Sequence, residues 1–99
     1  EFLYVDDIAD ALVFLMERYS GDVPMNIGWG KDLSIRQLAE TIARTVGFEG
    51  ELVFDASKPD GTPRKLLDTS RLDDLGWTAS TGLDKGLEQT YAWFLENVA

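Results

Sequence analysis

Apolar side chains recur at helical spacing along the first half of the chain. Asp6 or Asp7 can cap a first helix that Gly21 ends, and its apolar face comprises Ile8, Leu12, Leu15, Met16 and Tyr19. The capping box Ser34-Ile35-Arg36-Gln37 begins a second helix, whose apolar face is Ile35, Leu38, Ala39, Ile42, Ala43 and Val46, with Gly47 at its end. The pattern therefore predicts two amphipathic helices here.

The second half of the chain carries two further helix signals, separated from the first two by a long loop. Residues 55–65 contain Gly61 and two prolines, Pro59 and Pro63, which predicts irregular structure. Asp68 or Ser70 opens a short helix that runs to Gly76. The last helix extends to the C-terminus, and its apolar stripe is Leu83, Leu87, Tyr91, Phe94, Leu95 and Val98.

Three short segments, residues 2–5, 23–27 and 51–54, have the composition or alternation of β-strands. No hairpin turn joins any two of them, so the sequence predicts a mixed α and β fold of about four helices and three short strands. Gly28-Trp29-Gly30 is predicted to be a turn, since it lacks the third glycine and the adjoining helix of a dinucleotide-binding fingerprint.

Composition narrows the classes of function. The 99 residues carry a formal net charge of −9, which disfavours nucleic acid as a partner, and the longest apolar run, Ala11–Met16, is too short to span a membrane. The chain has no cysteine, as expected of a cytoplasmic protein, and no histidine, so acid–base chemistry would need carboxylates, tyrosines or lysines. Because the chain begins at Glu1 within an apolar segment, we expect it to be part of a longer protein.

The charge changes sign only in the long loop. Residues 58–71 carry a net charge of +2, against −7 for residues 1–57 and −4 for residues 72–99. Arg64 offers a planar fork for phosphate, Lys65 a mobile positive charge, and Asp60 an acceptor for sugar or base groups. These residues predict a site for a phosphorylated, hydroxylated small molecule. The alternative is a solvated turn whose charges have no ligand.

Two other groups of residues are given structural interpretations. Asp6, Asp7 and Asp10 could hold a hard cation, but no calcium-binding loop accompanies them, so the prediction for them is helix capping. Trp77, Trp93 and Phe94 are predicted to serve in packing.

The segment Glu1-Phe2-Leu3-Tyr4-Val5-Asp6-Asp7 resembles a signature of the extended short-chain dehydrogenases/reductases that act on nucleotide sugars. Further segments resemble one branch of that family, the GDP-L-fucose synthases, and together they span essentially the whole chain. They are Asn26-Ile27-Gly28, Ser34-Ile35-Arg36, residues 53–68 with the run Lys58-Pro59-Asp60-Gly61-Thr62-Pro63-Arg64-Lys65, Leu75-Gly76-Trp77, Gly86-Leu87 and residues 90–97.

This resemblance implies that residues 1–99 are a C-terminal substrate-binding domain of an NADP-dependent epimerase and oxidoreductase. The family's cofactor loop and catalytic residues belong to an N-terminal Rossmann domain, so this chain alone is expected to bind no NADP(H), to be inactive and to have no catalytic residue. Motif positions assign binding of the GDP-sugar substrate to Asp60 and Lys65, with Arg64 following from its place in the run. The parent enzyme is expected to be a homodimer through its N-terminal domain, and this chain a monomer. Trp29 and Gly82 depart from the family pattern.

Two alternative functions remain open. The chain could be the same region of another nucleotide-sugar epimerase, reductase or dehydratase, although such relatives more often carry an arginine-proline-glycine turn where this chain has the Asp60 loop. It could also be a free-standing acidic interaction module.

Overall fold

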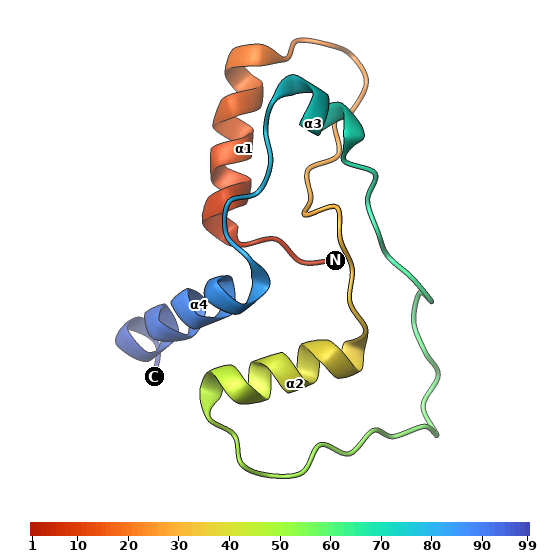
Figure 1. Ribbon diagram of the computed structural model, residues 1–99, viewed down its shortest axis with the longest axis vertical. Coiled ribbons are helices and arrows are strands. Elements are labelled where there is room, and N and C mark those ends of the chain that lie inside the picture. Colours follow the sequence, from red (N-terminus) through yellow and green to blue (C-terminus); the bar gives the residue numbers. More distant parts are fainter.

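The computed structural model describes residues 1–99 as four α-helices joined by irregular segments. Helix α1 (Val5–Arg18) and helix α3 (Ser70–Leu75) lie near one another at one end of the molecule (Figure 1). Helix α2 (Ile35–Val46) packs against helix α4 (Leu83–Asn97) at the other end. Residues 47–69 form a long connection that follows the outside of the molecule from α2 to α3 (Figure 1).

The structure confirms the four predicted helices but contains no β-strand, so the mixed α and β prediction with three short strands was wrong. The three candidate segments are irregular, apart from Val5, which begins α1. None of the backbone hydrogen bonds outside the helices joins one of these segments to another. A strand is stabilised by bonds to a neighbouring strand, and the period-2 pattern says nothing about whether that neighbour exists.

The acidic residues at the start of α1 do not cap it, contrary to the prediction. The helix begins after Tyr4, and no side chain provides a cap hydrogen bond. Asp7 is instead buried, and its carboxylate accepts hydrogen bonds from the Ser80 hydroxyl at 3.0 Å and the Thr81 N–H at 2.9 Å. Asp10 accepts a hydrogen bond from the indole Nε1 of Trp77 at 2.9 Å. These carboxylates therefore fasten α1 to the segment between α3 and α4.

A small apolar core lies where α1, α3 and the following segment meet. Ala11, Leu72 and Trp77 are its buried members, and Leu72 is only 1% exposed. The partly buried side chains packed around it are Leu3, Phe14, Leu15, Met25, Ile27 and Ala79. The prediction that Trp77 serves in packing is confirmed, and its indole N–H is satisfied by Asp10.

Helix α2 has the cap that its sequence predicts. The Gln37 N–H donates to the Ser34 hydroxyl at 3.1 Å, and the Ser34 N–H donates to the Gln37 side chain at 2.9 Å. Gly47 ends the helix with a left-handed φ of 72°, a conformation that glycine adopts without strain. Because the N-cap Ser34 directly follows Leu33, this cap also fixes where the segment of residues 29–33 meets the helix.

We predict that Gly82→Ser stabilises the start of α4. Gly82 occupies the N-cap position with φ −69° and ψ 166°, provides no side-chain acceptor, and has open space where a Cβ would stand. A serine there can accept a hydrogen bond from the first turn and restricts the unfolded chain, so we expect a gain of about 0.5 kcal/mol in the free energy of unfolding. Urea denaturation of the two proteins measures it, and Gly82→Ala is the control. Equal stability of the serine and alanine variants would contradict the capping effect.

Much apolar surface is uncovered. The radius of gyration is 16.3 Å, against about 13 Å for a compact domain of this length. Only 8 of the 99 residues are buried, and the exposed large hydrophobic side chains include Leu12, Val13 and Met16 on α1, the last of them 83% exposed. None of the four helices combines the length and the apolar character of a membrane-spanning helix.

Candidate functional site

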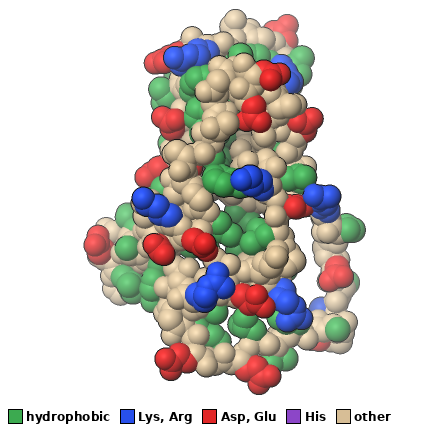
Figure 2. Space-filling view, in the orientation of Figure 1, with side chains coloured by type: hydrophobic (Ala, Val, Ile, Leu, Met, Phe, Trp, Pro, Cys, Tyr) green, Lys and Arg blue, Asp and Glu red, His purple; other side chains and the backbone are tan.

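The predicted site residues lie in the long connection between α2 and α3, and all three are exposed. Asp60 forms no hydrogen bond or ion pair, and the ammonium group of Lys65 has no partner. Arg64 is paired through its Nε with Asp32 of the segment before α2. The space-filling view shows the connection standing away from the body of the molecule, with open space behind it (Figure 2). The structure thus anchors Arg64 and leaves the side chains of Asp60 and Lys65 free.

The Asp32–Arg64 pair is exposed and polar. The side chain of Arg64 is 69% exposed and that of Asp32 is 30% exposed, so solvent weakens the attraction between them. The hydrogen bond from Arg64 is the main reason that the pKa of the Asp32 carboxyl lies below its usual value, and the same bond raises the pKa of Arg64. Only Nε is engaged, which leaves the two terminal nitrogens of the guanidinium available to an anion.

The lowered pKa of Asp32 predicts a pH dependence of this contact. A carboxyl whose pKa is depressed by folding stabilises the fold above its ordinary value of 3.8, and that contribution is lost as the pH falls through the lowered pKa. Titration of the Asp32 carboxyl carbon by NMR should therefore give a pKa below the usual range, rising towards it in Arg64→Gln. The same pKa in both proteins would show that the pair does not form.

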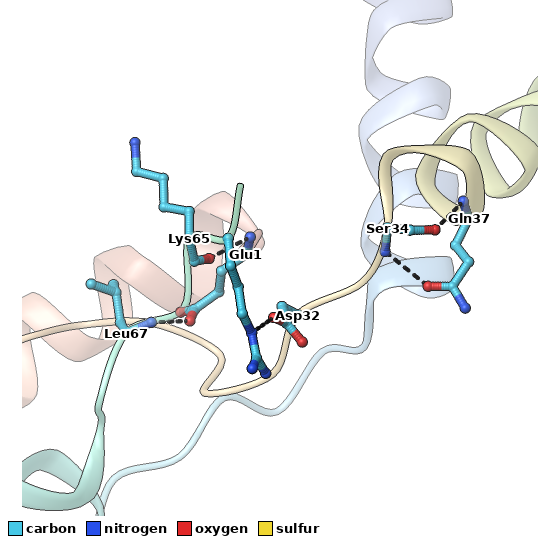
Figure 3. Close-up of polar contacts among 7 residues, drawn as sticks. Glu1, Asp32, Ser34, Gln37, Lys65 and Leu67 are labelled. Carbon is cyan, nitrogen blue, oxygen red and sulfur yellow. Dashed lines mark hydrogen bonds and ion pairs between the residues drawn. The ribbon is translucent and has the colours of Figure 1, made fainter. Parts of the chain in front are cut away.

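Glu1 is the residue that connects the end of the long loop to the rest of the chain. One of its carboxylate oxygens accepts a hydrogen bond from the Trp29 N–H, and the other accepts one from the Leu67 N–H, both at 2.8 Å. Figure 3 shows Glu1 between Lys65, Leu67 and Asp32, with the Lys65 side chain extending away from them.

Sequence reasoning did not find these contacts. From the sequence, Glu1 was predicted only to be part of a family motif, and no role was predicted for Asp32. The available signal was an acidic residue at the start of an apolar segment, since a carboxylate that is partly removed from water needs hydrogen-bond donors.

The turn at residues 28–30 borders two shallow pockets. The first, of about 190 Å³, is lined by Phe2, Trp29, Lys31, Asp32, Leu33 and Leu83. The second, of about 320 Å³, is more polar and is lined by Gly28, Trp29, Gly30, Lys31, Thr69, Asp73, Thr78 and Ala79. Gly30 has a φ of 77°, and no helix follows until α2, which confirms a turn at this point. Trp29 lines both pockets, which was not predicted from the sequence.

No cluster of acidic side chains forms a metal site. The structure contains no group of three or more potential ligands placed to hold an ion. Of the three aspartates considered from the sequence, Asp7 and Asp10 already accept hydrogen bonds from Ser80, Thr81 and Trp77. These carboxylates therefore hold segments of the fold together.

Comparison with known proteins identifies the class. No family model matches the chain. A GDP-6-OMe-4-keto-L-xylo-heptose reductase from C. jejuni superposes with a TM-score of 0.83 at 36% identity, over 92% of this chain and 29% of the other. An NADP-bound GDP-mannoheptose C4 reductase from Campylobacter jejuni gives a TM-score of 0.77 at 35% identity, over 91% of this chain and 29% of the other. Over nearly its whole length the chain is therefore similar to GDP-sugar reductases that have the short-chain dehydrogenase/reductase fold.

Within that class, the chain is similar to the C-terminal part of GDP-L-fucose synthases. GDP-L-fucose synthase 1 of Arabidopsis thaliana is 59% identical over 98 residues, which are 99% of this chain and 30% of that protein. The chain thus spans about a third of the length of the curated relatives it matches. The family resemblance that the sequence motifs indicated is confirmed.

Proposed function

We propose that residues 1–99 are the C-terminal substrate-binding domain of an enzyme that makes GDP-L-fucose. The enzyme would convert GDP-4-keto-6-deoxy-D-mannose by epimerisation at C3 and C5, followed by NADPH-dependent reduction at C4. The observation that carries this proposal is the 59% identity to a GDP-L-fucose synthase over 99% of the chain. The heptose reductases are 35–36% identical to the chain, which favours a fucose synthase over a heptose reductase.

The long connection supplies the groups that a GDP-sugar needs. Arg64 keeps two guanidinium nitrogens free beside its contact with Asp32, and a diphosphate can accept hydrogen bonds from them in parallel. The unpaired ammonium of Lys65 adds a second positive charge one residue away. Asp60 is unpaired and can accept hydrogen bonds from hydroxyl or amino groups of the ligand. In this proposal all three residues bind substrate and none acts on the reacting carbons.

In this proposal NADP(H) is not bound by the residues of this chain. Gly28 and Gly30 lie in a turn without the third glycine or an adjoining helix start, which the dinucleotide-binding motif requires. We therefore assign the cofactor, which supplies hydride to the C4 ketone, to a separate Rossmann domain that precedes this segment in the full-length enzyme. The contribution of this chain is to bind and orient the substrate.

The exposed apolar side chains are evidence that another domain covers this surface. Leu12, Val13 and Met16 of α1 and Trp93 of α4 are each more than half exposed. Apolar patches of this kind usually mark surfaces that another domain or protein covers. We assign that role to the Rossmann domain of the same polypeptide, and we place the dimer contacts of the full-length enzyme on that domain, so that this chain alone is a monomer.

Turnover by the full-length enzyme tests the proposal. With GDP-4-keto-6-deoxy-D-mannose, it should oxidise NADPH and release GDP-L-fucose, whereas a GDP-4-keto-heptose should react far more slowly. The 99-residue chain alone should give no NADPH oxidation above a protein-free control, because it lacks a cofactor site. Faster turnover of the heptose would assign the chain to the GDP-heptose reductases instead.

A further inference from the structure

We infer that Glu1 is a positioning residue for the substrate-binding loop and that Gly28 is required for it to act. This inference rests on the proposed function and adds to it a residue that touches no ligand. The side chain of Glu1 joins two segments that lie far apart in the sequence, the turn at residues 28–30 and the end of the loop at residues 65–67. Its effect on substrate would pass through Lys65 and Arg64.

The carboxylate is suited to its two partners. The N–H groups of Trp29 and Leu67 each donate to a different oxygen of Glu1, so both oxygens must be acceptors. Glutamine has the same shape but only one acceptor oxygen, and its NH₂ group would face one of the two N–H donors. Hydrogen bonds to a charged acceptor are also stronger than those to a neutral one.

The absence of a side chain at position 28 makes room for this carboxylate. A Cβ built on Gly28 would lie 1.9 Å from Oε1 of Glu1 and 3.0 Å from Cδ1 of Leu67. Gly28 does not have a positive φ, so alanine there meets no backbone strain. The Gly28→Ala substitution therefore acts by pushing the Glu1 carboxylate away from the Trp29 N–H.

Few other contacts hold this end of the loop. Besides the bonds to Glu1, the polar contacts with distant segments are the Arg64–Asp32 pair and a 3.3 Å hydrogen bond from the Asn26 side chain to the carbonyl oxygen of Asp68. The Glu1 carboxylate contacts the main chain at Leu67, two residues after Lys65 (Figure 3). Without these bonds, Lys65 and Arg64 would sample more positions, and binding substrate would carry the cost of ordering them.

The experiment compares Glu1→Gln and Gly28→Ala with wild type in the full-length enzyme. The hydrogen bonds from the Trp29 and Leu67 N–H groups to the Glu1 carboxylate are called the clamp. Amide hydrogen exchange at Trp29 and Leu67 measures whether the clamp forms, and steady-state kinetics measure its effect on substrate binding. In both variants we expect faster exchange at these amides, a KM for the GDP-sugar raised about tenfold, and a kcat and a KM for NADPH within about twofold of wild type. The controls are Glu49→Gln, an exposed glutamate without a partner, and Gly82→Ala, where a Cβ meets nothing.

Each alternative result has a distinct meaning. Unchanged exchange at both amides would show that the clamp does not form. Faster exchange with an unchanged KM for the GDP-sugar would show that the clamp does not position the loop. An equal rise in both KM values with a lower melting temperature would indicate general structural damage and overturn the positioning role. If the wild-type enzyme turns over no GDP-sugar, the proposed function fails, and the exchange data alone decide whether Glu1 holds the loop.

Discussion

Replacement of Leu72 by alanine is expected to lower the local free energy of unfolding by about 3–4 kcal/mol. Leu72 is the largest fully buried side chain, and it joins α3 to Ala11 of α1 and to Trp77. Alanine would remove most of this side chain from the contact between the two helices, and it would leave a cavity that the surrounding side chains fill only in part. Amide exchange of α1 and α3 in the full-length protein, followed as urea is added, measures the loss.

Leu75→Ala is the matched control for this prediction. Leu75 lies on the same short helix but is 37% exposed, so its truncation removes less buried surface. We expect a loss of about 1 kcal/mol or less for it. Equal losses for the two variants would show that α3 is not anchored through Leu72.

Loss of Lys65 is expected to have the largest effect on substrate binding. In the full-length enzyme, Lys65→Ala should raise the KM for the GDP-sugar by roughly 10- to 100-fold, the equivalent of one charged hydrogen bond to phosphate. Because the side chain is exposed and unpaired, stability should be unchanged. The phosphate is remote from the reacting carbons, so kcat should change little. Steady-state kinetics at low and high salt test this, since the effect should shrink as salt screens the charges.

Asp60→Asn should behave differently from Lys65→Ala in the same assay. It keeps the shape of the side chain but weakens its acceptance of hydrogen bonds, so selectivity among nucleotide sugars should fall, with little dependence on salt. Lys85→Ala, which removes an exposed cation from α4, is the control for a general loss of positive charge. If neither the Lys65 nor the Asp60 substitution changed KM, the loop would be a solvated turn whose charges bind no ligand, which is the alternative given in the sequence analysis.

The parts of the fold with local signals were predictable from the sequence. The Ser34–Gln37 capping box and Gly47 lie within one turn of the helix ends that they define, so their pattern sufficed to locate α2. Asp7 was misassigned because its partners, Ser80 and Thr81, are more than 70 residues away in the sequence. The strand predictions failed for the same reason, because strand formation depends on a distant partner that periodicity does not reveal.

In the candidate site too, residues with a local sequence pattern were predicted, and contacts between distant residues were not. Asp60, Arg64 and Lys65 were found from charge in a proline-rich loop and from motif positions, and their role as ligands of substrate stays a prediction. Arg64 could not be connected to Asp32, nor Leu67 to Glu1, because each contact joins residues at least 32 positions apart. Trp29 was assigned to a turn from its glycine neighbours, but the pockets around it depend on α4 and α3 folding back to the same place.

The most direct test of the account is amide hydrogen exchange of residues 58–67 in the full-length enzyme, with and without GDP-L-fucose. This ligand should slow exchange in the loop containing Asp60, Arg64 and Lys65, because ordering of the loop around the diphosphate would reduce its opening. NADPH alone should leave the loop unchanged. When the same fraction of each enzyme has GDP-L-fucose bound, the ligand should slow exchange at fewer amides in the Lys65→Ala variant than in wild type. Binding of GDP-L-fucose without any protection of residues 58–67 would contradict the assignment of this loop as the GDP-sugar site.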